Sequence, residues 1–271
     1  MTNTDQLRTA SDAEFSRAIA SEAGALLLAL RESFGPIQDR ADELRAQADR
    51  QSHELLAERI GQARPDDALL SEEGVDSRDR LTANRVWIVD PLDGTWEYGQ
   101  GRADFAVHVA LWHADRREVS SCTVDLPAQR LTRTMLDPVP TWHLPSDRPI
   151  RIVASRTRPP KSLPEVAQAL GRALQQAEVN AHGGEVVDVG SVGAKVNEIL
   201  IGNAEAYVHD TGFREWDVAA PYGVAHHYGL VACHLDGSPV MFNNEPPWVP
   251  NLIVSQPALM PFLRQSLDAH S

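Results

Sequence analysis

Two aspartates stand out in the stretch WIVDPLDGTWEY, residues 87–98, where a run of strand-forming residues ends. Pro91 fixes the backbone between Asp90 and Asp93, so both carboxylates are predicted to converge at the carboxyl end of one strand. Two like charges about 4 Å apart repel by about 4 kcal/mol at an effective dielectric constant of 20, so they must separate, share a proton or bind a cation. Oxygen ligands with no cysteine or histidine nearby favour Mg²⁺ or Mn²⁺ over zinc.

The same turn also suits a phosphate group. Gly94 permits close approach of the backbone, and a helix beginning at Thr95 would offer free N–H groups to an anion. Taken alone, an Asp-Pro-x-Asp-Gly sequence is more often an ordinary surface turn. Other acids change that balance: Glu72 and Glu73 follow the short apolar run ALLS, and Asp217 lies where a helix is predicted to begin, although N-capping would also explain an aspartate there. These strand and helix ends indicate one shared acidic site.

The elements that must position these acids follow from residue spacing. Ser11 and Glu14 match a capping box before a helical apolar repeat that ends at Gly35, and a second helical pattern covers residues 51–63. Strands are predicted after it at 68–71, 85–90, 104–112 and 118–127. Because loops rather than long helices separate these strands, antiparallel pairing is expected and the first half is α+β.

Four prolines between residues 136 and 149 disfavour regular structure, so we place a boundary there between lobes 1–148 and 149–271. Beyond it, strands and helices alternate. Strands are predicted at 151–154, 184–190 and 205–209, and helices at 163–177, 191–204 and 217–229. This alternation predicts βαβ crossovers and an α/β second lobe.

Composition limits the functional classes. The 271 residues, 42% of them hydrophobic, suffice for a large core. No apolar run approaches the roughly 20 residues that cross a bilayer, and the first residues lack the pattern of a signal peptide, so we expect a cytoplasmic protein with no membrane partner. A net charge of −13 disfavours a nucleic-acid polymer, whereas local cations could hold a small anion. Cys122 and Cys233 are expected to be buried free thiols without a role.

The order and spacing of SEE, WIVDPLDGT and EWDVAAP along nearly the whole chain resemble the inositol monophosphatase superfamily of Mg²⁺-dependent, lithium-sensitive phosphatases. Its motifs have the form acidic pair, D-P-[LI]-D-G-T and W-D-x-A-[AG]. The stretches NRVWIVDPLDGT and GSVGAK are similar to the branch of CysQ-type bisphosphate nucleotidases, particularly the actinobacterial kind. The resemblance implies a layered αβαβα sandwich with an N-terminal antiparallel sheet lobe and a C-terminal mixed α/β lobe.

The resemblance also implies two or three Mg²⁺ ions, with Mn²⁺ as a substitute. The implied metal ligands are Glu72, Asp90, the Leu92 carbonyl, Asp93 and Asp217, the last of which is also expected to contact the substrate. It further implies that Thr95, helped by Asp49, orients the attacking water together with Glu72, and that the Gly94 and Thr95 amides hold the scissile phosphate. Glu73 matches a position behind the metal ligands, where a solvated acid is an equal alternative.

The chain departs from the family pattern in one segment. Where many relatives carry D-x-V-T-x-A-D, residues 39–51 read DRADELRAQADRQ, so Asp49 keeps its place while the threonine and the upstream lysine loop are lost. If this segment is a mobile loop, activity is expected to need more Mg²⁺.

Substrate contacts are predicted at the start of the helix 191–204. Gly190 and Ser191 form its N-terminus, although a plain N-cap role for Ser191 is at least as strong an interpretation. Lys195, at the edge of the apolar stripe, could meet a second phosphate, although most such lysines are solvated. Arg156 and Arg158 resemble basic residues near the nucleotide phosphate in some relatives.

The function implied by the resemblance is Mg²⁺-dependent hydrolysis of adenosine 3',5'-bisphosphate to AMP and phosphate, in sulfur assimilation. Inositol monophosphatase or fructose-1,6-bisphosphatase activity is the alternative: Asp210 matches a sugar-hydroxyl acceptor of inositol phosphatases, with a turn aspartate before Gly212 as the favoured interpretation. A non-catalytic metal-binding regulator is less favoured, because every acidic position is intact. The expected partner is a small phosphorylated substrate, and a homodimer is left open.

Overall fold

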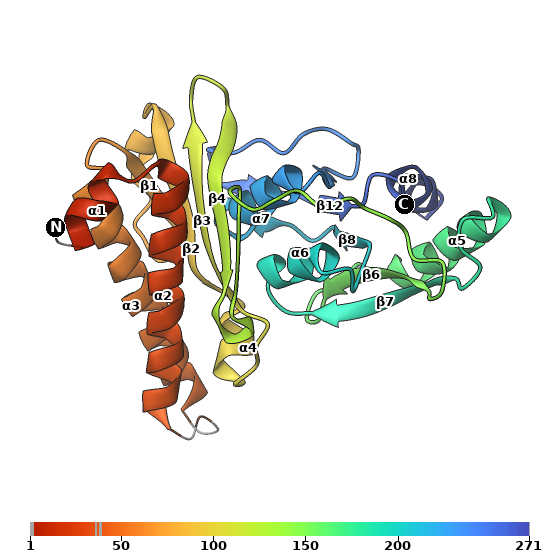
Figure 1. Cartoon of the computed structure of the whole chain (residues 1–271), viewed down its shortest axis with the longest axis horizontal. Helices are drawn as coiled ribbons and strands as arrows, with labels where there is room; N and C mark the ends of the chain where they lie inside the picture. Colours follow the sequence, from red (N-terminus) through yellow and green to blue (C-terminus); the bar gives the residue numbers. More distant parts are fainter. Residues whose placement is uncertain (1–2, 36, 38–39, 271) are drawn as a thin grey trace.

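The computed structural model describes residues 3–35, 37 and 40–270, and Figure 1 shows two sheets with helices between them and on their outer sides. The first half contains α1 (Asn3–Thr9), α2 (Asp12–Phe34), α3 (Ala41–Ala63), β1 (Ala68–Ser71), η1 (Arg78–Leu81), β2 (Arg85–Asp93), α4 (Thr95–Gly99), β3 (Ala106–His113), β4 (Glu118–Leu126), η2 (Pro127–Gln129) and β5 (Leu131–Thr134). The second half contains β6 (Ile150–Ser155), α5 (Leu163–Gln176), β7 (Gly184–Val189), α6 (Val192–Leu200), β8 (Ala206–His209), β9 (Phe213–Arg214), α7 (Glu215–His227), β10 (Val231–Cys233), β11 (Trp248–Val249), β12 (Leu252–Ser255) and α8 (Met260–Asp268).

The two long N-terminal helices begin differently from each other. The capping box predicted for α2 is confirmed, because Ser11 Oγ accepts from the Glu14 amide and the Glu14 carboxylate accepts from the Ser11 amide. Helix α3 begins at Ala41, ten residues before the predicted start, because residues 41–50 are rich in strong helix formers. Asp49 therefore lies inside a helix, which corrects the expectation of a loop there.

The first sheet has the order β1-β2-β3-β4-β5. The predicted antiparallel pairing is confirmed from β2 to β5, but β1 runs parallel to β2. The segment 72–84, which contains η1, returns the chain from the carboxyl end of β1 to the edge of the sheet where β2 begins. Two parallel strands require such a return connection. The sheet is thus mixed at one edge.

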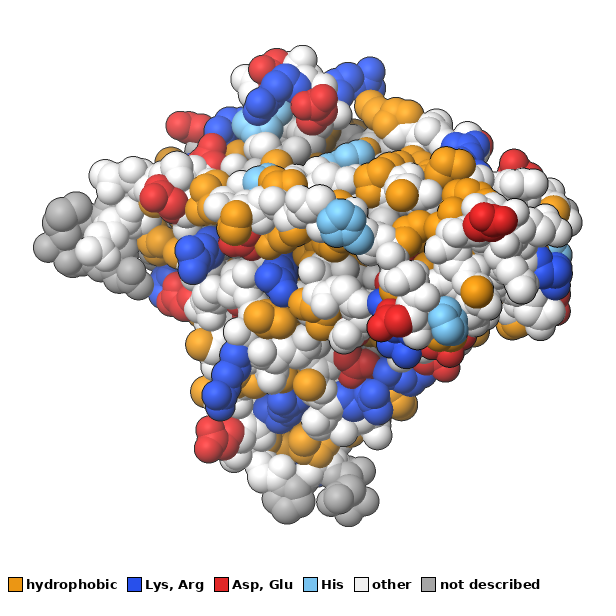
Figure 2. All heavy atoms as spheres, turned by 45° about the vertical axis from the view of Figure 1, so that its right-hand side comes forward, with side chains coloured by type: hydrophobic (Ala, Val, Ile, Leu, Met, Phe, Trp, Pro, Cys, Tyr) orange, Lys and Arg blue, Asp and Glu red, His pale blue; other side chains and the backbone are white. Residues whose placement is uncertain are grey.

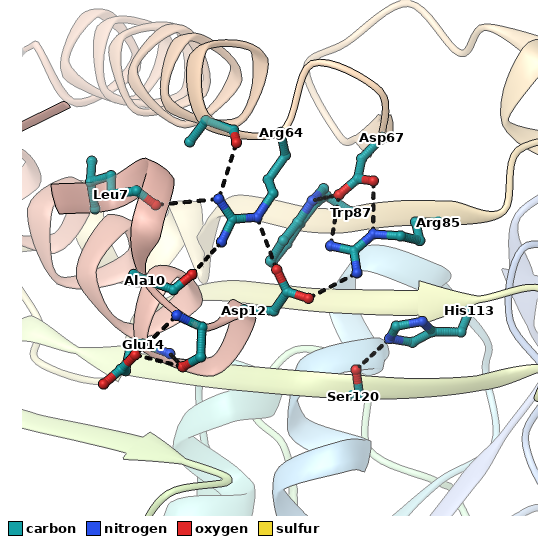
Figure 3. Close-up of polar contacts among 12 residues, drawn as sticks. Leu7, Ala10, Asp12, Glu14, Arg64, Asp67, Arg85, Trp87, His113 and Ser120 are labelled. Carbon is teal, nitrogen blue, oxygen red and sulfur yellow. Dashed lines mark hydrogen bonds and ion pairs between the residues drawn. The ribbon is translucent and has the colours of Figure 1, made fainter. Parts of the chain in front are cut away.

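An ion-pair network fixes the N-terminal helices to the start of β2 (Figure 3). Asp12 accepts from Arg64 Nε and Arg85 Nη1, each at 2.9 Å, so one carboxylate joins α2, the end of α3 and β2. Asp67 receives two hydrogen bonds from Arg85 and one from Trp87 Nε1. Because this network lies at the amino end of β2, it holds the strand in place without occupying its acidic carboxyl end.

The second sheet has the order β10-β12-β8-β6-β7. Strand β6 runs parallel to β7 and β8, and α5 and α6 make the crossovers, as predicted. Strands β12 and β10 add antiparallel neighbours, so the lobe is mixed α/β. Residues 136–149 form neither helix nor strand.

The layers follow the order helix, sheet, helix, sheet, helix (Figure 1), as predicted. Helices α2 and α3 cover the outer face of the first sheet, α6 and α7 lie between the sheets, and α5 and α8 cover the second sheet. The central apolar cluster takes residues from both halves, for example Ile88 and Val224. Because the halves share this core, the division at residue 148 stays a prediction.

The surface mixes charges of both signs. With the side that carries α5 and α8 turned forward, Lys and Arg side chains lie among Asp and Glu side chains and scattered apolar ones (Figure 2). Among the described residues, every helix is too short or too polar to cross a membrane. Cys122 and Cys233 are buried free thiols, as predicted.

Candidate active site

The parallel pairing of β1 with β2 brings two acidic strand ends together. In this register Ser71 lies beside Val89, so the next residue, Glu72, follows β1 near Asp90. Asp90 is 1% exposed, and its Oδ1 accepts from the Leu92 amide at 3.0 Å. The Glu72 and Asp90 carboxyl groups lie close enough for each to affect the pKa of the other.

Helix α7 adds Asp217 to this region from the second half of the chain. Asp217 is the third residue of α7, and its Oδ2 accepts from the Arg214 amide at 3.0 Å. Asp217 thus bonds to the helix start from inside the first turn. The N-cap itself is Arg214, so the N-capping role considered for Asp217 is wrong, because α7 begins two residues before the predicted start. Because α7 packs against β2, β3 and β4, the same side chain is near enough to raise the pKa of Asp90.

Electrostatic repulsion among these acids is strong. Burial, followed by the charges of Glu72, Asp93 and Asp217, raises the pKa of Asp90 well above its usual value. Burial, then Asp93 and Glu72, does the same to the pKa of Asp217. Burial, followed by neighbouring acids, raises the pKa of Glu72 to about 7. Glu72 is exposed, so solvent screens part of the repulsion that raises its pKa. The neighbouring acids nevertheless also raise this pKa.

The donor chemistry of this region fits a hard divalent cation. Its donors are carboxylate and carbonyl oxygens, which Mg²⁺ prefers. Within the part of the chain that the structure describes, no three acidic, histidine or cysteine side chains already form a metal-holding group. The residue types therefore fit a divalent cation, and the set of metal ligands stays a prediction.

Asp93 connects the first sheet to helix α6. Its Oδ2 accepts from the Val192 amide at 2.6 Å and from the Gly193 amide at 3.4 Å. These are first-turn amides of α6, where an anion is favoured. The fully buried His108 places Nε2 3.5 Å from the same oxygen. The start of α6 is therefore already bonded to a carboxylate of the protein.

Thr95 has the partners expected of it. Its hydroxyl donates to the Leu92 carbonyl at 3.0 Å and lies 3.5 Å from Asp49 Oδ1, a long contact. Burial, followed by the charge of Glu73, raises the pKa of Asp49 to about 7. The structure thus brings Asp49 and Glu73 to the acidic region, with Asp49 on a rigid helix.

A cavity of about 200 Å³ opens beside these acids. Its lining includes Asp93, Gly94, Thr95 and Asp217 from the acidic region, together with Gly190, Ser191 and Lys195. Ser191 caps α6 by accepting from the Ala194 amide. Lys195 is 3% exposed, donates to the Gly190 carbonyl, and has a pKa lowered to about 8 by burial. The predicted substrate residues therefore share one cavity with Asp93 and Asp217. The other predicted site residues are not among its lining residues: Asp49, Glu72, Asp90 and Leu92.

The two arginines differ in position. Arg156 directly follows β6 and pairs with Glu97 in α4 and with Asp104 after α4, each at 2.7 Å. Arg158 is exposed and lines the cavity. Asp210 is also exposed but is not among the residues that line the cavity.

Several cavity residues were not predicted from the sequence. They are Trp96, Glu97, Ser155, Thr157, Val192, Tyr207, His209 and Phe213. Trp96 directly follows the DGT turn, and that adjacency was a usable signal. Tyr207 and His209 belong to the apolar strand β8, where nothing in the sequence distinguishes a core position from a cavity wall.

Comparison with known proteins agrees with this fold. The model of the inositol monophosphatase family matches residues 7–270. The chain belongs to this family and is an enzyme of its phosphatase class. It is 41% identical over 263 residues to the 3'-phosphoadenosine 5'-phosphate phosphatase of Mycobacterium leprae, covering 93% of this chain and 92% of that one. The protein of the same name from Mycobacterium bovis is 40% identical, covering 89% and 88%.

Solved structures confirm the fold. CysQ from Bacteroides thetaiotaomicron superposes with a TM-score of 0.72 at 22% identity, covering 90% of this chain and 96% of that one. Inositol monophosphatase II from Staphylococcus aureus MSSA476 gives 0.70 at 17% identity, covering 95% and 96%. At these identities the likeness concerns the fold alone.

Proposed function

We propose that this protein removes the 3'-phosphate of adenosine 3',5'-bisphosphate in a Mg²⁺-dependent reaction in the cytoplasm, releasing AMP and phosphate. The observation that carries the proposal is the shared cavity, in which buried Lys195 and exposed Arg158 add positive charge beside the carboxylates. A substrate with two phosphates needs cations beyond those that balance the acids. The nearly full-length similarity to the mycobacterial phosphatases supports the same substrate.

The metal would be held by oxygen donors of the chain. In this proposal they are Glu72, Asp90, the Leu92 carbonyl, Asp93 and Asp217. Mg²⁺ supplies charge neutralisation at the phosphate and eases ionisation of the attacking water. The expected number of ions is two or three, with Mn²⁺ as a substitute.

The protein's own groups orient the reactants. Because the Thr95 hydroxyl proton is directed to the Leu92 carbonyl, the hydroxyl oxygen can accept from the attacking water. Glu72 orients the same water from the other strand. Asp49 helps Thr95 through its charge, from a distance of 3.5 Å, while the hydroxyl proton stays with the Leu92 carbonyl. The Gly94 and Thr95 amides hold the scissile phosphate, and Lys195 faces the second phosphate. Water attacks phosphorus, and the bond to the 3' oxygen breaks. One hydrogen of the water stays on the released phosphate, and the other proton ends on the 3' oxygen, which leaves as a hydroxyl.

A phosphate-release assay tests the proposal. Adenosine 3',5'-bisphosphate, inositol 1-phosphate and fructose 1,6-bisphosphate are compared with Mg²⁺ and without it, and again with added lithium. We expect the highest kcat/KM for the adenosine compound, no turnover without Mg²⁺, and inhibition by lithium. A higher kcat/KM for either sugar phosphate would reject the assigned substrate, and turnover of none would indicate a non-catalytic protein. The sugar alternatives have weaker support, because Asp210 lies outside the cavity lining.

A further inference from the structure

An exposed tryptophan forms part of the cavity wall. Trp96 is 45% exposed and lines the cavity together with Arg158 and Ser191. Among the described residues, the other large apolar side chains with this degree of exposure lie outside the cavity lining: Val75, Leu81, Leu136, Val139, Val179, Ile201, Met241 and Trp248. A single exposed apolar side chain on an open surface needs no explanation. Trp96 differs because its exposed side chain faces a cavity that also contains charged residues.

The backbone that carries Trp96 is held firmly. Its neighbour Glu97 is 6% exposed and pairs with Arg156 at 2.7 Å. Tyr98 is fully buried, donates to the Leu27 carbonyl at 2.8 Å and packs edge-on against Phe105 at 5.0 Å. Since both following residues are anchored in the protein, the indole is presented to the cavity from a fixed position and is not exposed by a loose segment.

The residues that line the cavity limit the classes of ligand that the Trp96 indole can contact. Flat aromatic side chains stack on nucleobases whatever their sequence, because every base has a π-face. The cations Lys195 and Arg158 suit phosphate groups, and a guanidinium also stacks on a flat ring. Inositol and fructose phosphates offer hydroxyl groups and no aromatic face. An indole beside these cations therefore matches a phosphorylated nucleoside.

We propose that Trp96 is a specificity-determining residue that stacks against the nucleobase of the substrate. The inference rests on the proposed function and adds the part of the substrate that is recognised: an aromatic base, bound through its face. Recognition through the face rather than the edge predicts little preference between adenine and other purines.

The test compares two substrates that differ only in the base. Native protein and the Trp96→Ala and Trp96→Phe variants are assayed with adenosine 3',5'-bisphosphate and with the base-free methyl riboside 3,5-bisphosphate. We expect Trp96→Ala to lower kcat/KM for the adenosine compound by about tenfold, mainly through KM. The base-free compound should change by less than about twofold, and Trp96→Phe should restore most of the loss. Trp248→Ala is the matched control, because Trp248 is 43% exposed outside the cavity lining.

A binding measurement separates this inference from the proposed function. AMP with Mg²⁺ should quench part of the tryptophan fluorescence of the native protein, and Trp96→Phe should remove that part of the signal. An equal loss of kcat/KM on both substrates, or a quench that survives in Trp96→Phe, would overturn the stacking role while leaving the phosphatase assignment intact. If native protein hydrolyses neither compound, the proposed function fails, and the quench still decides whether the indole meets a base.

Discussion

Asp93 uses its two carboxylate oxygens in different directions. Oδ2 accepts from the amides of Val192 and Gly193 and lies near His108, so it connects the first sheet to α6. In the proposed mechanism, Oδ1 remains to bind a cation. A carboxylate divided in this way fixes the position of the proposed metal site relative to the substrate helix.

Replacing Asp93 by Asn separates these two roles. The amide oxygen of Asn can still accept from the α6 amides, while the lost negative charge removes a cation ligand. We expect kcat/KM to fall by about 10³-fold, with a melting temperature within a few degrees of the native value. Phosphate release and thermal unfolding, measured on the same preparations, check both parts. Near-native activity in this variant would contradict the assignment of Asp93 as a metal ligand.

At the residue scale, the sequence identified the acids but not their partners. Asp90, Asp93 and Asp217 stand out because charged residues rarely end apolar strands or begin buried helices. That Asp93 would bond to α6, nearly a hundred residues later, depends on the packing of two layers and has no local signal. The contact between His108 and Asp93 could not be predicted for the same reason, because an inward-facing histidine in a strand such as β3 is usually an ordinary core residue.

Gly94 shows how one turn controls the site. Its φ of +87° lies in the left-handed region, and an added Cβ would come within 3.2 Å of the Asp104 carbonyl, Phe105 Cα and Ser191 Cβ. We expect Gly94→Ala to lower the free energy of unfolding by about 1–2 kcal/mol from backbone strain alone. Activity should fall at least tenfold, because relief of the contact moves Asp93 or Thr95.

Gly202 provides the matched control for this turn. It has a φ of +77° and nothing within 4 Å of an added Cβ, so Gly202→Ala carries the backbone strain without the contact. Urea unfolding and phosphate release are measured on both variants. Equal activity losses would show that strain, and not the close approach at Gly94, controls the site.

A buried arginine holds the segment after Glu72 against the start of α7. Arg80 donates twice to Asp76, and also to Asn243 Oδ1 and the Asn244 carbonyl. The Asn243 and Asn244 amides in turn donate to Glu215, two residues before Asp217. One network thus connects two segments that carry acids of the site.

Replacing Arg80 by Met should destabilise the protein by about 3 kcal/mol, because Asp76 and Glu215 lose a compensating charge in a partly buried setting. Urea unfolding measures this loss, and magnesium titration should show weaker binding. Arg78→Met is the control: Arg78 is 79% exposed in its pair with Glu245, so about 0.5 kcal/mol or less is expected. Similar losses in both variants would contradict the role given to Arg80.

At the element scale, periodicity predicted most helices and strands but not the parallel β1–β2 pair. The loop after Glu72 has no long helix, and from the sequence such a connection favours antiparallel pairing. The actual pairing is decided by where β1 finds an open edge, which is a property of the assembled sheet. This parallel pair places Glu72 beside Asp90. Local residue spacing could not predict that Glu72 and Asp90 are neighbours, so this part of the site was predicted only from the resemblance to the family.

At the scale of the whole molecule, the acidic region is expected to make metal-free stability depend on pH. The pKa values of Glu72 and Asp49 are raised to about 7 by burial and by neighbouring acids, above their usual values near 4. A carboxyl group whose pKa is higher in the folded state stabilises that state below the unfolded pKa, and the contribution is lost as pH rises through about 7. The metal-free protein should therefore melt at a lower temperature at pH 8 than at pH 6.

Magnesium should reverse this trend, because a bound cation favours the ionised carboxylates. With Mg²⁺ at about a hundredfold excess over its dissociation constant, the melting temperature at pH 8 should rise by about 5 °C or more, and by clearly less at pH 6. Glu72→Gln is the matched control: without that charge, the metal-free protein should be more stable than the native form at pH 8, and the response to Mg²⁺ should shrink. A Mg²⁺ response of equal size at both pH values would show that these carboxylates do not bind the ion, and the proposed metal site would have to be abandoned.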